Sequence, residues 1–353
     1  MKQTKKGNGI GIVVAAYNAA ATLAHTLDSV QAAANVDAAA DAYAVDVCVV
    51  VADDGSTDET AAIVRRYAAA DGRVRLLELP HGGQAAARAA AIAALPEQFD
   101  WVMIVDADDT LPRLSLSQMA AFLSEDVDMV VANVAKYVEG TSTPSLYMDA
   151  AHVTAELPAK ASAGGDMSSS AAVRLTPTEA LERMLDNDIP NFTHGMMVRR
   201  SLFDRIEWDT HPSITNAEDA MLQLLLTSSA TGMVVLLPDV IAYEYRQRSG
   251  TLSSMSEVTP EGIARVWEAV SAVPTMPRTA LVRWGLGLMH IFLIGRGIWL
   301  PQNYKPLREI THLARRTPLH SRRHRRVLWL LRCPWLRALA TRRHRRAACR
   351  HTD

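Results

Sequence analysis

Four apolar runs in the first third of the chain alternate with segments in which apolar residues recur at helical spacing. The runs are apolar on consecutive positions and rich in β-branched residues, which is typical of strands buried on both faces. Between the first two runs, Leu23, Leu27 and Val30 recur every three or four positions, and this spacing predicts a helix. The pattern therefore predicts a mostly parallel sheet that helices cover on both faces, which is an α/β architecture. The four runs occupy residues 10–18, 45–54, 73–80 and 100–109.

Polar residues after the second run predict where the next helix begins. The stretch ADDGSTDET contains Ser56 and Thr57, either of which can cap a helix, and Glu59 follows Ser56 at the spacing of a capping box. We therefore expect a helix from about Asp58 to Ala70.

The chain changes character several times after the fourth run. Residues 129–140 predict a further strand, and residues 141–175 form a low-complexity stretch that we expect to be a long loop or insertion. Order resumes at residues 176–187 with a helix that Thr176 caps. From about residue 260 the chain is predicted to be helical and becomes increasingly basic.

The composition is that of a globular protein with an uneven distribution of charge. With 353 residues, of which 49% are hydrophobic, the chain can build a substantial core, which excludes a disordered protein. The formal net charge is −1, but residues 305–353 hold 15 Lys and Arg against 2 acidic residues, so we expect an anionic partner for this tail. The three cysteines have no paired spacing, which argues against disulfides or a zinc site and fits a reducing compartment.

The basic tail combines arginine clusters with apolar residues. Leucines, Val327 and Trp335 lie between two RRHRR clusters at residues 322–326 and 342–346. Such a segment suits a helix in the interface of an anionic membrane, and the alternatives are RNA binding or a solvated tail without a partner. No run reaches the roughly 20 apolar residues that span a bilayer. Residues 284–295 come nearest and predict a buried or interfacial helix.

The fourth run ends on three aspartates within four positions, Asp106, Asp108 and Asp109. Adjacent carboxylates raise one another's pKa unless a cation joins them. Oxygen ligands suit Mn2+ or Mg2+, which are usually held by one or two carboxylates together with substrate phosphates. The sequence thus indicates a divalent metal site, and a solvated turn that caps the next helix is the alternative.

Other polar residues follow the second and third runs at the same predicted edge of the sheet. Asp53 and Asp54 come directly after a buried strand, where their oxygens can accept hydrogen bonds from a nucleoside. Gly82 and Gly83 allow a close backbone approach, and Arg88 is expected on the following helix, facing the same edge. A turn with a helix cap, and an ordinary surface position for Arg88, are the alternatives.

Four stretches, in this order and spacing, resemble family 2 glycosyltransferases with the GT-A fold. They are VVAAYNAAATLAHTLDSV, VVVADDGSTDET, HGGQAAARAAAIAA and VMIVDADD. AEDAMLQLLL at residues 217–226 and YEYRQRSGTLS at residues 243–253 are similar to two further family segments, so the resemblance covers about residues 10–255. It implies an inverting, metal-assisted transfer of a sugar from a nucleotide donor, a UDP-sugar, to a hydroxyl of a glycan or lipid-linked acceptor.

The resemblance also implies roles for single residues. Asp108 is the expected metal ligand in the motif it forms with Asp106, and Asp109 is the alternative. The proline that usually precedes the aromatic residue of the first loop is absent before Tyr17. The residues implied for the donor nucleotide are Ala16, Tyr17, Asn18, Asp53, Asp54, Arg88, Asp106, Arg246 and Arg248.

Glu218 and Asp219 correspond to the acidic pair of the family, in which the aspartate is the catalytic base. A carboxylate there would take the proton of the acceptor hydroxyl as it attacks. Without the resemblance, the pair is interpreted as the first turn of a helix, where the helix macrodipole stabilises acidic side chains. His194 lies where acceptor contacts are expected, with a structural role as the alternative. YEYRQRSGTLS contains no histidine that could serve as the late metal ligand of some relatives.

We therefore expect a GT-A fold with a C-terminal helical basic extension. The protein is predicted to act in cell-envelope polysaccharide synthesis, in the cytoplasm or peripherally on the inner face of the cytoplasmic membrane. A nucleotidyltransferase that forms sugar nucleotides is one alternative, although AAYNAAAT lacks its glycine- and arginine-rich loop, and a scaffold whose tail binds nucleic acid is another. The expected parts are a nucleotide-sugar half at 1–140, the loop at 141–175, an acceptor half with the catalytic base at 176–255, and the extension at 256–353.

Overall fold

The computed structural model divides the chain into two compact units, and each is described here by itself. The first unit comprises Met1–Pro212 and Ser229–Met255, and the second comprises Ser213–Ser228 and Ser256–Asp353. Most of the predicted loop at residues 141–175 and most of the basic tail lie outside the described residues. The structure describes residues 9–35, 45–139, 143–150, 153, 172–186, 189–190, 192–211, 213–214, 217–247, 259–274, 276–290, 304–317, 325, 327–329 and 331.

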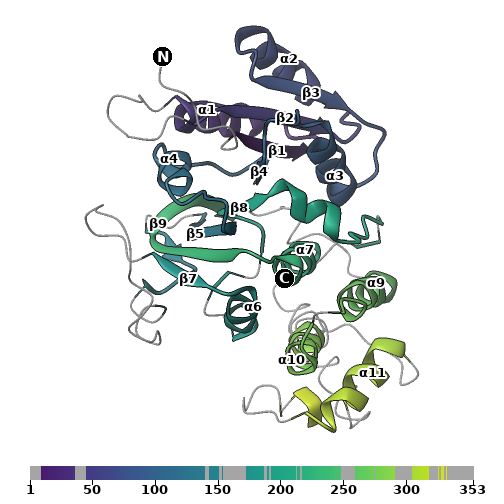
Figure 1. The fold of residues 1–353 in the computed structure, drawn as a ribbon. Helices are drawn as coiled ribbons and strands as arrows, with labels where there is room; N and C mark the ends of the chain where they lie inside the picture. Colours follow the sequence, from purple (N-terminus) through teal and green to yellow (C-terminus); the bar gives the residue numbers. More distant parts are fainter. Residues whose placement is uncertain are drawn as a thin grey trace. The chain divides into compact units, whose positions relative to one another are not determined.

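A mixed sheet forms the framework of the first unit. Its described strands are β1 Ile10–Ala16, β2 Val47–Asp53, β3 Val74–Glu78, β4 Trp101–Asp106, β5 Val127–Val138, β6 Ser145–Leu146, β7 Val173–Leu175, β8 Met196–Arg199 and β9 Met233–Gln247. They follow the order β3-β2-β1-β4-β8-β5-β9-β7, with β6 paired to β5. In Figure 1 the strands β1 to β4 lie above the other half of the sheet.

The first half of the sheet is parallel, as the four apolar runs predict. β1 pairs with β2 and β4, and β2 pairs with β3, all in parallel register. The register places Ala16 beside Asp53 and Ala15 beside Asp106. The carboxyl ends of β2 and β4 therefore lie on either side of the carboxyl end of β1.

Helices cover both faces of this parallel half, which explains why β1, β2 and β4 are apolar on consecutive positions. The described helices of the first unit are α1 Leu23–Ala34, α2 Thr60–Ala70, α3 Gln84–Ala94, α4 Ser115–Ala120, α6 Pro177–Asp186 and the 3-10 helix η1 Arg200–Arg205. Residues of α1, α2 and α4 join alternate residues of the strands in one core cluster. α3 packs on β1 and β2. Just after α3, Leu95 lies so close to Gly11 that a Cβ at Gly11 would be 2.5 Å from it.

β8 joins the two halves of the sheet. It lies between β4 and β5 and runs antiparallel to both strands. β9 runs parallel to β5, but residues 238–240 loop out of the pairing at Asn133. The buried Asn133 amide donates to the carbonyl oxygens of Met148 and Pro238, and its Oδ1 accepts from the N–H groups of Val134 and Met148. One fully bonded side chain thus fixes this irregular part of the sheet.

α2 begins later than predicted, and neither Ser56 nor Thr57 caps it. Its first residue is Thr60, and its N-cap residue makes no capping hydrogen bond through its side chain. Ser56 and Thr57 instead bond to Asn18 in the loop after β1. Asp58 Oδ1 accepts from the Thr60 N–H at 3.0 Å. The predicted cap is wrong because a neighbouring loop competes for the same polar groups.

The cap predicted for α6 is confirmed. Oγ1 of Thr176 accepts from the N–H of Glu179 at 3.3 Å, and the Glu179 carboxylate accepts from the N–H of Thr176 at 2.8 Å. This reciprocal pair is a capping box. Pro177 occupies the first position of the helix, where its missing N–H costs no hydrogen bond.

The described part of the second unit is helical. Three helices, α9 Pro260–Ser271, α10 Arg278–Met289 and α11 Lys305–Ala314, pack on one another. The Trp267 ring centroid lies 6.3 Å from that of Trp284, and the Trp267 indole N–H donates to the Glu309 carboxylate at 2.7 Å. No described helix is long and apolar enough to cross a membrane. Helix α7, Glu218–Ser229, also belongs to this unit up to Ser228.

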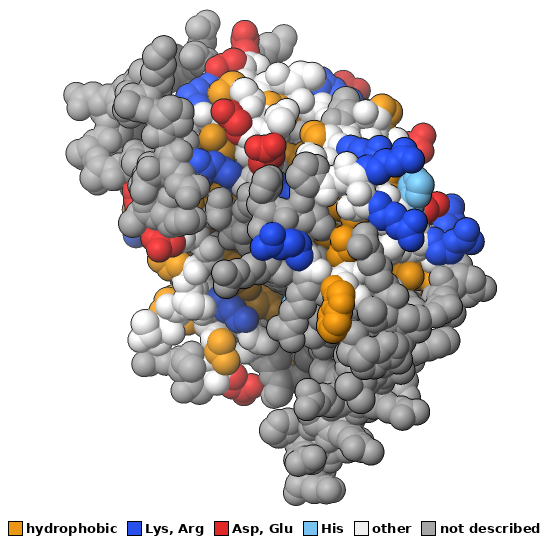
Figure 2. Space-filling model, turned by 90° about the horizontal axis from the view of Figure 1, so that it is seen from below, with side chains coloured by type: hydrophobic (Ala, Val, Ile, Leu, Met, Phe, Trp, Pro, Cys, Tyr) orange, Lys and Arg blue, Asp and Glu red, His pale blue; other side chains and the backbone are white. Residues whose placement is uncertain are grey.

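α11 is amphipathic with a basic exposed face. Its apolar side is buried through Leu307 and Ile310. Figure 2 shows Lys and Arg side chains gathered together with a histidine at the right of the face that it draws. The exposed basic residues at α11 and its end are Lys305, Arg308, His312, Arg315 and Arg316.

Candidate functional site

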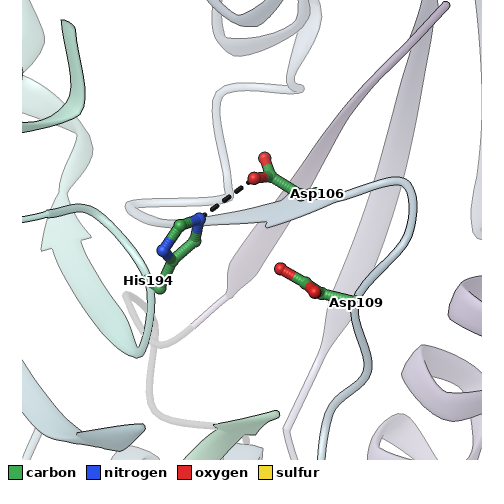
Figure 3. Close-up of side chains that lie close together, drawn as sticks. All are labelled: Asp106, Asp109 and His194. Carbon is green, nitrogen blue, oxygen red and sulfur yellow. Dashed lines mark hydrogen bonds and ion pairs between the residues drawn. The ribbon is translucent and has the colours of Figure 1, made fainter. Parts of the chain in front are cut away.

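Two aspartates and a histidine converge at the carboxyl end of β4 (Figure 3). One ligand atom from each of Asp106, Asp109 and His194 lies within 4.8 Å of the others. Asp109 and His194 are buried, while the Asp106 side chain is 18% exposed and so remains open to a ligand. These three residues are called the acidic cluster below.

The sheet topology explains why residues 88 positions apart meet. Asp106 is the last residue of β4, and His194 lies two residues before β8. The antiparallel register pairs Trp101 with Arg199 and Val102 with Val198. Continuing that register along the two strands brings position 194 opposite Asp106.

Asp106 has side-chain partners on both of its carboxylate oxygens, and Gln84 Nε2 donates to Oδ1 at 3.3 Å. Nη2 of Arg88 donates to Oδ1 at 2.6 Å, and Nε2 of His194 lies 3.0 Å from Oδ2. Burial by itself would raise the pKa of Asp106, but Arg88 and His194 together hold it below its ordinary value of 3.8. Arg88, which we expected at the nucleoside, is fully buried in this ion pair.

Replacing Arg88 with methionine is expected to destabilise the fold by about 3–5 kcal/mol, because it leaves the Asp106 carboxylate without its buried counter-ion. Chemical denaturation measures this change, with the exposed Arg75→Met as the matched control, expected to cost under about 0.5 kcal/mol. The pKa of Asp106 is depressed in the folded wild type. Its contribution to the free energy of unfolding is therefore fully present above about pH 3.8 and is lost as the pH falls through the folded-state pKa. The difference in the free energy of unfolding between wild type and Arg88→Met should therefore become smaller in acid. Equal free energies of unfolding at neutral pH would contradict a stabilising ion pair.

Asp109 is more deeply buried than Asp106, and its pKa is shifted in the opposite direction. The Tyr243 hydroxyl donates to its Oδ2 and the Arg246 N–H donates to its Oδ1, both at 2.8 Å. Burial, and after it the negative charge of Asp106, raises the pKa of Asp109 to about 7. The same Tyr243 oxygen accepts from the Asp106 N–H at 3.0 Å, so one phenol joins both aspartates. An added cation would stabilise the ionised form of Asp109.

The acidic cluster has a suitable donor set for a divalent metal. Carboxylate oxygens and an imidazole nitrogen are ligands that Mn2+ accepts in proteins, whereas Mg2+ is usually bound through oxygen. Asp108 is partly exposed and lies outside the group of three. The structure thus joins Asp106 and Asp109 with a histidine that the sequence did not assign to a metal, and the metal contact of Asp108 stays a prediction.

Hydrogen bonds between side chains and backbone lock the loops after β1 and β2 together. The N–H of Asn18 donates to Ser56 Oγ, and the N–H of Thr57 donates to Asn18 Oδ1, both at 2.9 Å. The N–H of Ala19 donates to Thr60 Oγ1 at 2.8 Å. Asn18 has φ +48°, a conformation that asparagine adopts more readily than most residues. The edge beside Tyr17 is therefore preorganised.

Asp54 holds the loop after β3. Its Oδ1 accepts from the Gly82 N–H at 2.7 Å and its Oδ2 from the Gly83 N–H at 2.9 Å. Gly83 has φ +94°, where a side chain would strain the backbone. Asp53 is freer, since its Oδ1 accepts from the Ser56 N–H at 3.1 Å and its Oδ2 bonds to no described residue. Of the two aspartates predicted to bind the nucleoside, Asp53 thus has the available oxygen.

Two exposed rings stack beside these loops. The centroids of Tyr17 and His81 are 4.4 Å apart with 28° between the planes. Tyr17 is 45% exposed, and Nδ1 of His81 lies 3.0 Å from the backbone oxygen of Asp54. The pair thus offers an anchored aromatic surface at the carboxyl edge of the sheet.

β1 separates this aromatic end from the acidic cluster. Asp53 and Asp106 lie on the strands on either side of β1, which sets them about 10 Å apart across two strand spacings. Ala16, the last residue of β1, is buried, and its carbonyl oxygen accepts from the Asp54 N–H at 2.8 Å. The carboxyl edge of the sheet therefore carries an aromatic surface and an acidic site, which lie on either side of β1.

Arg246 lies near the acidic cluster. Its guanidinium is 3.4 Å from both Thr110 Oγ1 and Glu244 Oε2, and its side chain is 36% exposed. These long contacts leave it able to turn toward a ligand. Arg248, predicted with it at the diphosphate, lies outside the described residues.

The acidic pair begins α7, in the second unit. Glu218 is buried and Asp219 is partly exposed. Ala217, directly before them, has φ +62°, a left-handed conformation that costs a non-glycine residue about 1–2 kcal/mol. Such strain is often found beside functional residues.

Comparisons with known proteins agree with this architecture. The family model described as "Glycosyl transferase family 2" matches residues 11–207. No curated protein matches the chain. The structure of S. aureus TarS 1-349 in complex with UDP-GlcNAc is similar with 19% identity and a TM-score of 0.63, covering 96% of this chain and 89% of that chain.

Two further TarS structures are similar in the same way. For S. aureus TarS 1-349 in complex with UDP, the identity is 17%, the TM-score 0.60, and the shares covered are 98% and 92%. For S. aureus TarS, the identity is 17%, the TM-score 0.59, and the shares are 94% of this chain and 54% of that chain. These likenesses confirm the predicted fold, with its mostly parallel central sheet and C-terminal helices.

Proposed function

The chain belongs to glycosyl transferase family 2, and from this premise we propose that it transfers a sugar from a UDP-sugar to a hydroxyl of a glycan or lipid-linked acceptor. Membership makes the protein a glycosyltransferase rather than a nucleotidyltransferase or a binding scaffold. The observation that carries the proposal is the acidic cluster, placed across β1 from Asp53 at the carboxyl edge of the sheet. This is the edge where open α/β sheets bind ligands.

The donor nucleotide would lie along that edge. The free oxygen of Asp53 can accept an N–H of the base, while Tyr17 offers a ring face for stacking. The fixed loops of Asn18 and Asp54 keep these groups in place before a ligand arrives, which lowers the entropy cost of binding. TarS structures that hold UDP-GlcNAc and UDP support a UDP-linked donor.

The diphosphate would lie at the acidic cluster. Asp106, Asp109 and His194 would hold a Mn2+ ion there, with Asp108 as a further candidate ligand. When bound, such a metal stabilises negative charge on the leaving diphosphate. Arg246 can turn its guanidinium toward the same phosphates, and Arg88 keeps the Asp106 carboxylate ionised and fixed.

The acceptor would react with inversion at the anomeric carbon. We propose Asp219 as the base that takes the acceptor hydroxyl proton, with Glu218 as its neighbour in the family's acidic pair. Residues 1–140 then serve as the nucleotide-sugar half and residues 176–255 as the acceptor half. The C-terminal extension from residue 256 would keep the enzyme near an envelope acceptor.

A donor panel tests this function most broadly. Binding and turnover of UDP-GlcNAc, UDP-glucose, UDP-galactose and GDP-mannose would be measured by calorimetry and by release of the nucleotide, with Mn2+ or with a chelator. We expect at least one UDP-sugar to bind in a Mn2+-dependent manner and to be turned over. If no donor binds in the presence of metal, the proposed function is wrong.

The aromatic pair gives a prediction of moderate size. Tyr17→Ala is expected to weaken UMP binding by about fivefold to tenfold, because a stacked ring is worth roughly 1 kcal/mol. His81→Ala should weaken it less, since His81 supports the tyrosine from one side. Calorimetry with UMP measures both variants, and His25→Ala, at an exposed position of α1, serves as the control. Unchanged UMP binding by Tyr17→Ala would contradict the stacking role.

We propose a peripheral position on an anionic membrane through the basic C-terminal region. Reversing three exposed charges in Arg308→Glu, Arg315→Glu and Arg316→Glu is expected to lower binding to phosphatidylserine vesicles by at least about tenfold, because each basic residue near such a surface contributes roughly 1 kcal/mol. Flotation of the full chain measures the effect.

A matched triple variant controls for net charge. Arg66→Glu, Arg75→Glu and Arg113→Glu reverse three exposed arginines of the first unit, so the total charge changes equally. Flotation is expected to stay near that of the wild type. An equal loss in both triple variants would show that only the net charge matters, and no loss in either would rule out α11 as the contact.

A further inference from the structure

Aromatic side chains form a continuous row from the acidic cluster to the surface of the first unit. The His194 ring lies 4.8 Å from Tyr243 and 5.8 Å from Tyr245, both on β9. The His194 ring is also 5.2 Å from Phe192, which meets Tyr147 edge to face at 4.6 Å. Aromatic residues make up 6% of the chain, so this concentration is unusual for a core built mainly of Val, Leu, Ala and Met.

The row begins in the core and ends in solvent. Tyr243 is fully buried and its hydroxyl is used by the two aspartates. Phe192 is partly exposed, and Tyr147 is 37% exposed. Core packing accounts for Tyr243 and in part for Phe192, which packs against the core cluster. The outer pair, Phe192 and Tyr147, nevertheless keeps accessible ring surface.

The backbone holds Tyr147 firmly although its ring is accessible. Its N–H donates to the Val134 carbonyl oxygen at 3.2 Å. The next residue, Met148, is bonded through both backbone groups to the buried Asn133 side chain. The ring thus stands on a fixed segment, which reduces the entropy cost of using it to bind a ligand.

The phenol of Tyr147 is a neutral polar group within electrostatic reach of the acidic cluster. Burial, followed by Tyr245 and Asp109, raises the pKa of Tyr147 to about 12. Its hydroxyl bonds to no residue that the structure describes, so it can donate to or accept from a ligand. The outer pair thus combines two ring surfaces with one available hydroxyl.

We propose that Tyr147 and Phe192 form a subsite for a sugar ring next to the reacting centre. This inference rests on the proposed function. A pyranose has a face of C–H groups that packs on aromatic rings, and hydroxyls that need polar partners. A ring pair with a polar tip meets both needs, as in small-molecule sites lined by aromatic residues with a few placed polar groups. The sugar comes either from the donor or from the acceptor.

The donor arm compares UDP with UDP-GlcNAc in the presence of Mn2+. If the subsite holds the donor sugar, Tyr147→Ala and Phe192→Ala should weaken UDP-GlcNAc binding by about fivefold to tenfold and leave UDP binding unchanged. Tyr147→Phe should lose only part of this, because it keeps the ring. Leu146→Ala is the matched control, since it removes an apolar side chain that is 52% exposed on the neighbouring position.

The acceptor arm uses methyl glycosides of glucose, galactose and N-acetylglucosamine as probes, with UDP and Mn2+ present. Saturation-transfer NMR signals from the glycosides should fall at least threefold in Tyr147→Ala and Phe192→Ala and persist in Leu146→Ala. Calorimetric UDP binding shows that each variant still folds around the nucleotide. A loss in either arm supports the subsite and names the source of the sugar.

Failures of the two proposals are distinguishable. If the wild type binds neither UDP nor UDP-GlcNAc, the proposed function fails and the subsite falls with it. If the wild type binds them and both alanine variants match it in both arms, only the subsite is overturned.

Discussion

Replacing Asp106 with asparagine is expected to lower sugar transfer by about a thousandfold or more, one of the two largest effects that we predict. Asp106 is the carboxylate that Arg88 and His194 keep ionised, so the change removes fixed negative charge from the cluster. Losing one preorganised electrostatic contact in an active site costs roughly a hundredfold to a thousandfold, and loss of a metal ligand adds to this. Turnover of the donor with saturating Mn2+ measures the effect.

The control for Asp106→Asn is binding of UMP, which lacks the diphosphate. UMP should bind the variant within about twofold of the wild type, because the Asp53 end of the edge is unchanged. The variant also removes the negative charge that pairs with the buried Arg88, so a stability loss of a few kcal/mol is expected and the assay is run well below the melting temperature. Normal turnover by a folded variant would remove Asp106 from the mechanism.

Replacing Asp219 with asparagine is expected to lower kcat by about a hundredfold to ten-thousandfold, the range found for a general base. The amide keeps the size of the side chain and the start of α7 but cannot take a proton. Because the base acts on the acceptor, binding of UDP and Mn2+ should change by less than about twofold. Rapid-quench assays of donor turnover separate the chemical step from binding.

Glu218→Gln is the matched control for the catalytic base. Glu218 occupies the same first turn of α7 but is buried, so we expect a smaller loss of kcat and a larger loss of stability than for Asp219→Asn. The opposite order, with Glu218→Gln inactive and Asp219→Asn active, would transfer the base role to Glu218.

The sequence predicts the first half of the fold well because its signals are local. Consecutive apolar positions identify β1, β2 and β4, and they arise from burial on both faces, a property of each strand alone. β3 lies at the edge of the sheet, and only its first residue, Val74, is buried. The Thr176 capping box is equally local and is confirmed. The cap predicted at Ser56 and Thr57 fails because their partner is Asn18, about 38 residues earlier in the chain.

The sequence predicts the acidic cluster only in part, because a register sets its third member. Asp106 and Asp109 stand out within one short run, whereas His194 joins them through the antiparallel insertion of β8 between β4 and β5. The residues around His194 contain no local pattern that predicts the pairing of β8 with β4. The role of Arg88 is hidden in the same way, since an arginine on a helix normally faces solvent and here it is fully buried under Asp106.

The two aspartates at the end of β2 differ in their hydrogen bonds, which the sequence does not show. Both were predicted to bind the nucleoside, yet the oxygens of Asp54 accept the N–H groups of Gly82 and Gly83. Asp53 keeps one oxygen without a described partner. The β3–α3 loop thus occupies the oxygens of Asp54 and leaves Asp53 as the carboxylate that we propose for the nucleoside.

The central claim is that the acidic cluster holds a divalent metal together with the donor diphosphate. The most direct test is the free Mn2+ signal in electron paramagnetic resonance, titrated against the full chain with and without UDP. We predict about one Mn2+ bound per chain in the presence of UDP, lost in Asp106→Asn and Asp109→Asn and retained in the surface control Asp126→Asn. Equal Mn2+ binding by all four proteins, or none by the wild type with UDP, would contradict the account.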